Sequence, residues 1–303
     1  MSKLLADATA GDPIRGTKWT RKTLRKLGKV LEVSHETVRR LLINNLGYSL
    51  KGNRKCVSRK QDPDRDRQIR YIARMRRQFL AAKQPVISVD SKKKEQIGNF
   101  KTPGRTWRSE PKRVLSTDFP SDAIGKAIPY GIYDIAHNHG FVVVGMSHDT
   151  AQFAVNAIRS WWRLRGAKSY KKQSHILIQA DAGGSNSARS KLWKWELQQF
   201  ANETGLTITV IHHPVSASKW NWIEHRVFCN LSANWAGEPL LSFETILKFI
   251  RTTTSETGLT CSAILDRRNY KTRQSISKLQ LATLQIEPHR ILPKWNYTIR
   301  PNL

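Results

Sequence analysis

The spacing of apolar residues predicts two short helices near the start of the chain. Leu24, Leu27 and Leu31 recur at helical spacing, and after a two-residue break Ser34 can cap a second helix with its own apolar stripe. Two short helices joined by a tight turn are typical of a helix-turn-helix motif. We therefore expect a helix-turn-helix domain over residues 1–50.

From about residue 84 the pattern changes to short β-rich runs that alternate with helical stretches. The expected strands lie at residues 86–89, 141–144, 176–179 and 207–211. The expected helices lie at residues 68–82, 150–165, 187–203, 220–233 and 243–251. Strands that alternate with helices predict a mixed α/β domain with a central sheet. We place this domain at residues 84–240, after a basic linker and helix at 51–83 and before a helical extension and tail at 241–303.

Composition adds a strong positive charge to this picture. The 303 residues include 52 lysines and arginines but only 23 aspartates and glutamates, which gives a net charge of +29. Residues 1–80 hold 21 of the basic residues and 7 of the acidic ones. Such an excess favours nucleic acid as the partner, because each phosphate neutralised by a cation releases condensed counterions.

Other classes of protein are excluded by what the sequence lacks. The first residues contain no apolar run typical of a signal peptide, and no run elsewhere is long enough to span a membrane. The three cysteines are far apart, which excludes a disulfide framework and a cysteine-based zinc site. We therefore expect a cytoplasmic protein without membrane contacts.

The second predicted helix places basic and polar residues away from its apolar stripe. His35, Arg39 and Arg40 are among them, and such residues reach base edges and phosphates from the major groove of duplex DNA. A solvated basic face would give the same pattern. The charge of residues 1–80 favours DNA binding, so double-stranded DNA is the expected partner.

Three carboxylates stand out by their positions. Asp90 ends the apolar run PVISVD, Asp181 ends HILIQAD and is followed by AGGSN, and Glu224 lies in the helical pattern KWNWIEHRVF. A carboxylate at the end of a buried strand is held on rigid backbone, and the glycines after Asp181 allow a phosphate backbone to approach closely. Carboxylates are also the ligands that Mg²⁺ prefers. An Asp, Asp, Glu set of this kind suits two-metal cleavage of a phosphodiester.

Each of the three carboxylates also has a plainer interpretation. A strand-terminal aspartate is often a turn residue or a helix N-cap, and a helical glutamate is usually a solvated surface residue. Other aspartates compete for the same role, and Asp118 in VLSTDFP is the strongest of them. The remaining competitors are Asp122, Asp134 and Asp149. The histidines form no convincing metal-ligand spacing and are interpreted as structural.

Several ordered blocks of the sequence resemble one known family. The blocks are PVISVDSKKKEQIGNFK, GKAIPYGIYDIAHNHGFVVVG, DTAQFAVNAIRSWW, ILIQADAGGSNSARSKLWKWELQQFA, SKWNWIEHRVFCNLSANWAGEPL and TTTSETGL. Together they are similar to the ISAzo13-type insertion-sequence transposases, and the similarity runs from about residue 12 to residue 301. Ordered blocks over this length are far more specific than a single short motif.

The resemblance implies a fold, a set of catalytic residues and a cofactor. The fold would be RNase H-like, a mixed α/β sheet flanked by helices, with the first aspartate on the central first strand, the second after the fourth strand and the glutamate on a later helix. Asp90, Asp181 and Glu224 would form the DDE triad and bind two Mg²⁺ ions, with Mn²⁺ as a substitute, in a catalytic domain at residues 84–240. Strand position and metal chemistry select the same three residues.

Basic residues near the three carboxylates are expected to hold DNA phosphates. They are Lys92, Lys93, Lys94, Lys219 and Arg226. The expected protein is a DNA transposase that binds element ends, cleaves them and transfers the freed strand to target DNA. We expect it to act as a homo-oligomer in a synaptic complex, because joining two ends requires two active sites. We expect this complex in the bacterial cytoplasm, at the nucleoid.

The sequence also departs from the family pattern. The loop before the glutamate differs at Val215, Ala217 and Trp222, and Ala182 stands where the family commonly has glycine. The family's N-terminal region is longer, so we expect one DNA-binding helical unit to be missing. Two alternatives therefore stay open: a catalytically inactive DNA-binding relic at element ends, and an RNase H-like nuclease that acts on RNA or hybrids.

Overall fold

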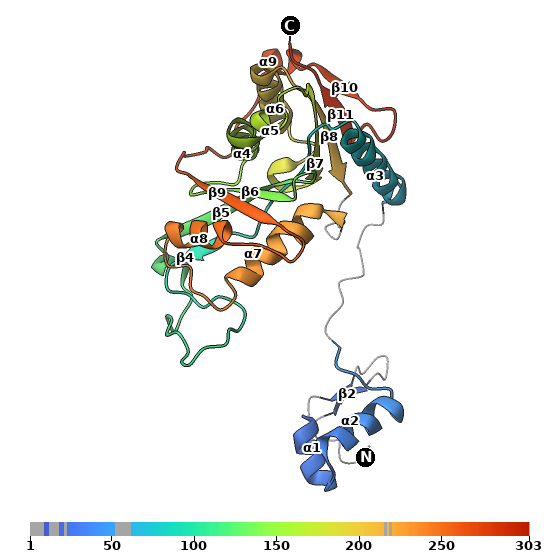
Figure 1. The fold of residues 1–303 in the computed structure, drawn as a ribbon, viewed down its shortest axis with the longest axis vertical. Helices are drawn as coiled ribbons and strands as arrows, with labels where there is room; N and C mark the ends of the chain where they lie inside the picture. The colour runs from blue at the N-terminus through green and yellow to red at the C-terminus, as the bar shows by residue number, and fades with distance from the viewer. Residues whose placement is uncertain are drawn as a thin grey trace. The chain divides into compact units, whose positions relative to one another are not determined.

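The computed structural model describes two compact units of the chain (Figure 1). The N-terminal unit is Met1–Ser58 and the larger unit is Arg59–Leu303. The described residues are 23–51, 62–214, 217 and 220–302, together with the backbone of two short strands, β1 (Thr9–Gly11) and β2 (Lys18–Thr20). Most of the predicted linker and the predicted phosphate-binding residue Lys219 lie outside this part of the chain.

The two helices predicted near the start of the chain are present in the N-terminal unit. They are α1 (Leu24–Leu31) and α2 (His35–Asn44). Ser34 caps α2 as expected, because its Oγ accepts a hydrogen bond of 3.1 Å from the backbone N–H of Thr37. The turn between the helices is tight, and Glu32 adopts a left-handed conformation there, with φ of 54°. Leu27 and Val38 pack together in a small core.

A mixed sheet of nine strands, counted over the described residues, forms the centre of the larger unit. Its strands are β3 (Val86–Ser91), β4 (Glu95–Ile97), β5 (Gly125–Asp134), β6 (His139–Gly145), β7 (His175–Asp181), β8 (Thr207–His213), β9 (Thr260–Asp266), β10 (Ile286–Pro288) and β11 (Asn296–Ile299). The order is β10-β11-β8-β7-β3-β5-β6-β9, and β4 pairs with β5. β3, β7 and β8 run parallel, whereas β5 is antiparallel to both of its long neighbours, β3 and β6.

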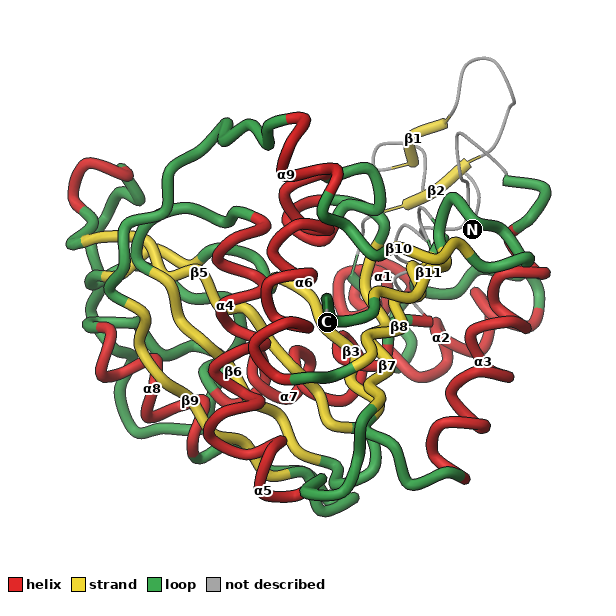
Figure 2. Tube along the Cα trace, turned by 90° about the horizontal axis from the view of Figure 1, so that it is seen from above, coloured by secondary structure: helices red, strands yellow, loops and turns green. Residues whose placement is uncertain are grey.

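Helices cover both faces of this sheet, as Figure 2 shows. The α-helices of the larger unit are α3 (Arg65–Ala81), α4 (Ala151–Trp161), α5 (Ala167–Ser169), α6 (Lys191–Thr204), α7 (Cys229–Asn234), α8 (Phe243–Arg251) and α9 (Lys278–Ala282). The shorter turns are the 3₁₀ turns η2 (Pro120–Asp122) and η4 (Gly184–Asn186) and the π-helical turns η3 (Trp162–Gly166) and η6 (Glu224–Phe228). This arrangement confirms the expected mixed α/β sheet flanked by helices.

The two faces of the sheet carry different cores because side chains alternate along each strand. On one face, α4 and α6 contribute Phe153 and Trp193 to a core that includes Ile178. On the other face, α3 packs on Val86 and Leu177. The continuous η6–α7 helix and α8 cover the rest of this second face, over β5, β6 and β9. The second face is the one that bears the candidate site.

All four predicted strands are present, but the pattern of the sequence did not predict β5. β5 contains Pro129 and Gly131, which are turn signals when the sequence is considered alone. The carbonyl of Pro129 accepts a hydrogen bond from the N–H of Lys92, just past the end of β3. Lys92 and Pro129 face each other at the end of the ladder, and the proline supplies only its carbonyl to this pair, so its missing N–H costs a single bond at the point where β3 ends. β9 and the β10–β11 hairpin were missed as well, and they bring residues beyond 240 into the sheet.

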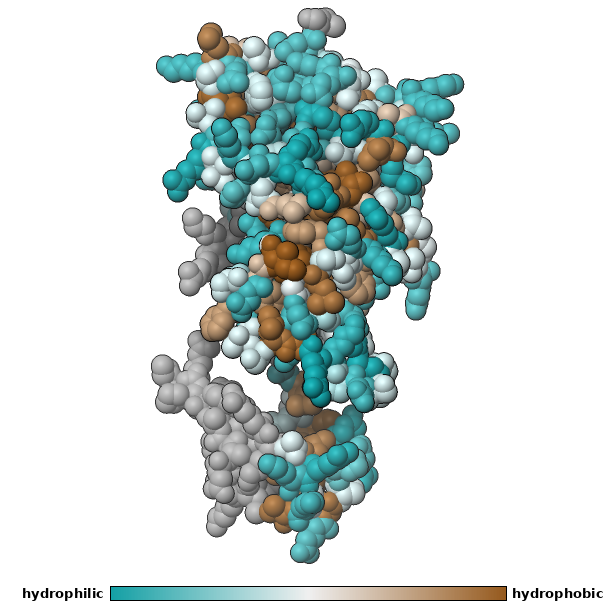
Figure 3. Space-filling model, turned by 90° about the vertical axis from the view of Figure 1, so that its left-hand side faces the viewer, coloured by the Kyte–Doolittle hydropathy of each residue, from teal (hydrophilic) through white to brown (hydrophobic). Residues whose placement is uncertain are grey.

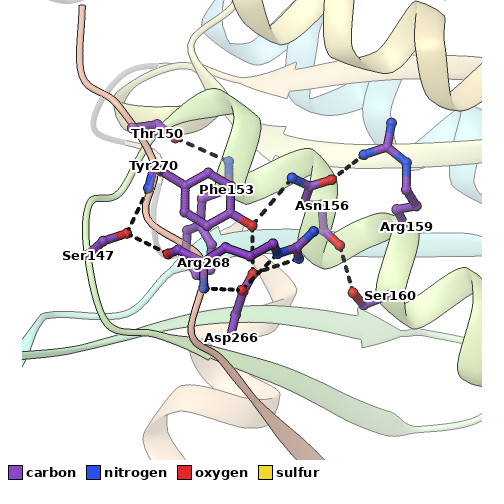
Figure 4. A network of polar contacts seen from close by, with 9 residues as sticks. All are labelled: Ser147, Thr150, Phe153, Asn156, Arg159, Ser160, Asp266, Arg268 and Tyr270. Carbon is purple, nitrogen blue, oxygen red and sulfur yellow. Dashed lines mark hydrogen bonds and ion pairs between the residues drawn. The ribbon is translucent and has the colours of Figure 1, made fainter.

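A partly buried polar network joins the segment after β9 to α4, where Asn156 donates to the hydroxyl of Tyr270 (Figure 4). The carboxylate of Asp266 accepts hydrogen bonds from Tyr270 at 2.6 Å and from the Arg268 side chain at 2.7 and 2.9 Å. Burial raises the pKa of Asp266, but these hydrogen bonds outweigh it and hold the pKa below the ordinary value. Ser147, in the loop between β6 and α4, donates to the carbonyl of Arg268 and accepts from the N–H of Tyr270. The network therefore holds the β6–α4 loop in place.

The surface drawn in Figure 3 is largely hydrophilic, with hydrophobic side chains gathered in patches. Trp107, Phe119 and Ile124 are among the exposed large hydrophobic residues, and all three lie in the segment between β4 and β5. Within the described part of the chain, none of the helices combines the length and apolar character that a membrane span requires.

Candidate functional site

The candidate site begins with two aspartates at the centre of the sheet. Asp90 lies in β3 and Asp181 is the last residue of β7, and these strands are parallel neighbours. The register pairs Val89 with Ala180, so the next residue along each strand brings the two aspartates side by side, on strands about 4.8 Å apart. Because side chains alternate, both aspartates belong to the second face of the sheet, which the η6–α7 helix covers.

Glu224 reaches this edge from a helix. It opens the π-helical turn η6, and such widened turns often occur at functional sites. The helix packs closely on β5 at Gly131, where a Cβ would come within 2.6 Å of the Ile223 side chain and 2.7 Å of the Phe228 ring. Gly131 is also the ladder partner of Asp90. The absence of a side chain at Gly131 therefore lets the helix that carries Glu224 pack beside Asp90.

Hydrogen bonds tie the start of this helix to β3. Asn221 donates from Nδ2 to Oδ2 of Asp90 at 2.9 Å. Ser88 donates from Oγ to Oδ1 of Asn221 at 2.7 Å and accepts from the N–H of Ile223 at 3.3 Å. The other oxygen of Asp90 accepts from the N–H of Ser91 at 2.8 Å. Asn221 and Ser88 are buried, so groups excluded from water orient the Asp90 carboxylate.

The three carboxylates influence one another electrostatically. The pKa of Asp90 is raised to about 7, mainly by burial and next by the charge of Asp181, with a smaller contribution from Glu224. Burial is also the main cause of the raised pKa values of Asp181 and Glu224. The nearby charges of His225 and Lys92 partly offset that rise for Glu224. Negative charge is therefore concentrated in a poorly solvated place.

The donor chemistry of this cluster fits a hard divalent cation. All three side chains offer carboxylate oxygens, which Mg²⁺ and Mn²⁺ accept as ligands. A bound cation would favour the ionised form of Asp90 and so offset the repulsion that raises its pKa. Over the described residues, no three acidic, histidine or cysteine side chains are grouped closely enough to hold a metal ion as they stand.

Asp149 is a fourth carboxylate at the same edge. Ser91 donates from Oγ to Oδ1 of Asp149 at 3.0 Å, and the charge of Asp149 contributes to the raised pKa of Asp90. Ser185, in the turn after β7, lies with its Oγ 3.3 Å from that of Ser91. Asp149 follows β6 in the loop that the Asp266 network holds. The loops after β3, β6 and β7 thus meet at the candidate site.

The other rival aspartates lie elsewhere. Asp118 and Asp122 are exposed, between β4 and β5. Asp134 is buried at the end of β5, and its Oδ1 accepts a hydrogen bond of 2.8 Å from the hydroxyl of Tyr170. Only Asp149 among the four rivals contributes to the raised pKa of Asp90.

The predicted phosphate-binding residues differ in how far they are exposed to solvent. Lys92 donates to Glu95 at 2.8 Å and lies 4.7 Å from the ring centroid of Trp235, so it is already engaged within the protein. The exposed residues of the set are Lys93, Lys94 and Arg226. These three can meet a ligand that approaches from solvent.

Two residues near the site carried no signal in the sequence. Arg76 of α3 is half-buried, and its guanidinium lies 4.5 Å from the ring centroid of Trp222, with Arg226 at 5.6 Å from the same ring. His212 is buried, which lowers its pKa to about 4 and keeps it neutral. Its Nδ1 donates to the carbonyl of Asp181 at 3.0 Å, since a carbonyl can only accept. The histidine interpreted as structural therefore supports the second aspartate.

The predicted DNA-reading residues lie on the surface of α2. His35, Arg39 and Arg40 are all exposed. Arg39 forms an ion pair of 3.0 Å with Glu36, one turn earlier on the same helix. Such an exposed pair contributes little to stability, so it leaves Arg39 able to change partner.

Two solved structures of another transposase are similar to this chain. One is the pre-cleavage Mos1 transpososome, with 14% identity, a TM-score of 0.47 and coverage of 76% of this chain and 66% of that one. The other is a Mos1 transposase paired-end complex with left transposon end, with 14% identity, a TM-score of 0.46 and coverage of 76% and 65%. The similarity thus spans slightly less than two thirds of those chains. No curated protein matches the chain.

A family model matches almost the whole chain. It is described as the Rhodopirellula transposase DDE domain and covers residues 1–301. This match agrees with the resemblance to the ISAzo13-type transposases that the sequence blocks suggested. The chain therefore belongs to the family of Rhodopirellula transposase DDE domains.

Proposed function

We propose that this protein is an insertion-sequence transposase that cleaves DNA at element ends and joins the freed strand to target DNA. The observation that carries the proposal is the position of Asp90 and Asp181, side by side at the ends of β3 and β7 and on the face covered by the helix that contains Glu224. In this proposal residues 1–50 form the DNA-binding domain, and residues 84–240 form the catalytic domain that cleaves and joins DNA.

The proposed reaction has two steps. A water oxygen attacks a phosphodiester phosphorus, the P–O3′ bond breaks, and a 3′-hydroxyl and a 5′-phosphate result. The 3′-hydroxyl then attacks a phosphorus of target DNA. A new P–O bond forms, the P–O3′ bond of the target breaks, and the target strand is left with a free 3′-hydroxyl. Two Mg²⁺ or Mn²⁺ ions held by Asp90, Asp181 and Glu224 would activate the attacking oxygen and stabilise the leaving one.

The other side chains of the site prepare the carboxylates and the DNA. Asn221 and the N–H of Ser91 fix the orientation of Asp90. Lys93, Lys94 and Arg226 would bind phosphates on either side of the reacting bond, because exposed cations near the carboxylates can neutralise the backbone. Proximity supplies a large part of the rate in such a site, since both reactants are held in line.

Element ends would be recognised by the N-terminal unit. The exposed residues His35, Arg39 and Arg40 of α2 suit contacts with base edges and phosphates. Two ends must meet for strand transfer, so we propose a homo-oligomer in a synaptic complex at the bacterial nucleoid.

The proposal is tested by cleavage of end-containing duplex in Mg²⁺. Asp90→Asn, Asp181→Asn and Glu224→Gln should each abolish cleavage and leave duplex binding nearly intact, because each removes a ligand charge without a change of shape. The exposed Asp118→Asn is the matched control and should retain activity. An inactive unmutated protein that still binds element ends would instead support a DNA-binding relic, and preferential cleavage of RNA or hybrids would support an RNase H-like nuclease.

Recognition of the ends is tested by titrating specific and random duplex across salt concentrations. Arg39→Ala or Arg40→Ala should lower discrimination by about 1–3 kcal/mol for each base that the variant no longer reads. A residue that touches only phosphate would, when replaced, weaken both duplexes equally and reduce the salt slope by about one unit. Equal binding of both duplexes by the unmutated protein would remove the sequence-reading role from α2.

A further inference from the structure

A basic pocket lies at the edge of the sheet opposite the carboxylates. Its volume is about 510 Å³, and its walls come from the residues before β3, the residues after β5 and the segment 168–173 before β7. β3 and β7 start beside this pocket and end at Asp90 and Asp181. A strand of six or seven residues separates the two sites, which is roughly 20 Å. The pocket is therefore too far from the carboxylates to hold the phosphate that reacts there.

The walls of the pocket carry positive charge without compensation. Four lysines line it and are exposed, and none of the described residues that line it is an aspartate or a glutamate. The lysines are Lys83, Lys168, Lys171 and Lys172. An anion that enters this pocket meets several cations and no repelling carboxylate.

The carboxylate of Asp134, which contacts two residues of the pocket wall, is turned inward. Asp134 is buried, and it accepts hydrogen bonds from the hydroxyl of Tyr170 at 2.8 Å and from Nδ1 of His137 at 3.0 Å. Its carboxylate oxygens are thus hydrogen-bonded within the fold. His137 lines the pocket, and its Nε2, on the far side of the ring from Asp134, makes no hydrogen bond to the described residues. The positive charge that the pocket offers an anion therefore comes from its lysines.

The chemistry of the walls points to phosphates rather than bases. A base is read by a bidentate arginine, asparagine or glutamine, or by a stacking ring. The pocket has Gln84, Gln173 and the His137 ring of this kind, but the four lysines outnumber them and Gln84 already accepts a hydrogen bond from a backbone N–H. Tyr170 is 7% exposed and its hydroxyl is occupied by Asp134, so it offers no stacking face. No arginine lines the pocket within the described part of the chain. Flexible lysines act as point charges, which suits a sugar-phosphate backbone of any sequence.

We propose that this pocket binds the phosphate backbone of the target duplex, at a point roughly 20 Å from the place where that duplex reacts beside Asp90 and Asp181. The inference rests on the proposed transposase function, in which an element end and a target must be held together. The target duplex is the one that a sequence-independent site suits, because its sequence is not read by base contacts. The lysines on two segments, before β3 and before β7, then fix its path along the far edge of the sheet.

The test compares two triple variants of the full chain. Lys168→Gln/Lys171→Gln/Lys172→Gln removes charge from the pocket, whereas Lys248→Gln/Lys271→Gln/Lys278→Gln removes the same charge from exposed positions outside it. Binding of random-sequence duplex is titrated at several salt concentrations. The slope of log affinity against log salt should fall by about 2.7 units in the pocket variant if all three lysines contact phosphates, since each contact contributes about 0.9. The control should change it by much less.

A second measurement separates this inference from the proposed function. Cleavage of a short end duplex that cannot reach the pocket should be unchanged in the pocket variant, while strand transfer into a long target duplex should fall. Equal salt slopes in the two triple variants, or an unchanged slope in both, would overturn the target-duplex site in this pocket. Cleavage that survives Asp90→Asn would overturn the proposed chemistry, and it would leave the salt-slope result for the pocket as it is.

Discussion

Among single residues, the groups that hold the carboxylates matter to the candidate site as much as the carboxylates themselves. Asn221 is 2% exposed and connects Asp90 to Ser88 through two hydrogen bonds. His212 supports the backbone of Asp181 in the same way. Because these contacts are buried, solvent cannot replace them when they are removed.

We expect Asn221→Ala to weaken the metal dependence of cleavage more than the binding of DNA. Loss of its hydrogen bond frees the Asp90 carboxylate to rotate, so the Mg²⁺ concentration for half-maximal cleavage should rise by roughly 10–100-fold. Asn230→Ala is the control, because Asn230 lies on the same helix and donates to the carbonyl of Arg226. Identical Mg²⁺ titrations for the two variants and the unmutated protein would show that Asn221 does not position Asp90.

Among the helices and strands, the contact between β5 and the η6–α7 helix decides where Glu224 lies. The contact is close because Gly131 has no side chain, and Ile223 and Phe228 occupy the space that a Cβ would need. One glycine thus sets how closely a helix packs on a strand that is far from it in the sequence. On the neighbouring strand β3, the residue paired with Gly131 is Asp90.

We expect Gly131→Ala to lower cleavage at least 10-fold while the protein stays folded, because the added methyl group displaces the helix and moves Glu224. The change is measured as the cleavage rate at saturating Mg²⁺. Gly125→Ala on the same strand is the control, since its Cβ would meet the Phe243 ring only at 3.4 Å. Combining Gly131→Ala with Phe228→Leu should restore part of the rate, and an unchanged rate in Gly131→Ala would refute the role of this contact.

In the larger unit taken as a whole, the helix near its start, α3, is hydrogen-bonded to the strand near its end, β11. Gln68 of α3 donates to Oδ1 of Asn296 in β11 at 2.6 Å and to the carbonyl of His212 in β8 at 2.8 Å. Asn296 returns a hydrogen bond to Oε1 of Gln68 at 2.8 Å. Both side chains are fully buried, so this pair ties residues 228 positions apart without contact with water.

We expect Asn296→Ala to destabilise the larger unit by about 1–3 kcal/mol, because it leaves Oε1 of Gln68 buried without its hydrogen-bond donor. For a unit of this size that lowers the melting temperature by roughly 2–4 °C per kcal/mol. The exposed Asn269→Ala is the control. Gln68→Leu combined with Asn296→Leu should recover much of the loss, and a thermal scan that separates neither variant from the control would contradict the role of the pair.

Features that depend on neighbouring residues could be predicted from the amino-acid sequence. Apolar spacing located the strands β3, β6, β7 and β8 and the helix α8, and Ser34 marked the start of α2, because periodicity and caps are local. Asp90, Asp181 and Glu224 became candidates because two of them end apolar runs and the third lies in a block shared with a family. The strand β5 was not found, because its Pro129 and Gly131 are turn signals when the sequence is considered alone.

Which distant residues meet depends on the folded chain. Asn221 reaches Asp90 across 131 positions, and Asp149 is brought to the same edge by the pairing of β5 with β6, which no local pattern records. Asp118, the strongest rival in the sequence, lies on the surface between β4 and β5 instead. The basic pocket is likewise assembled from three separate segments. Contacts of this kind depend on strand order and helix packing, and these are set by burial of the whole core rather than by any single stretch of sequence.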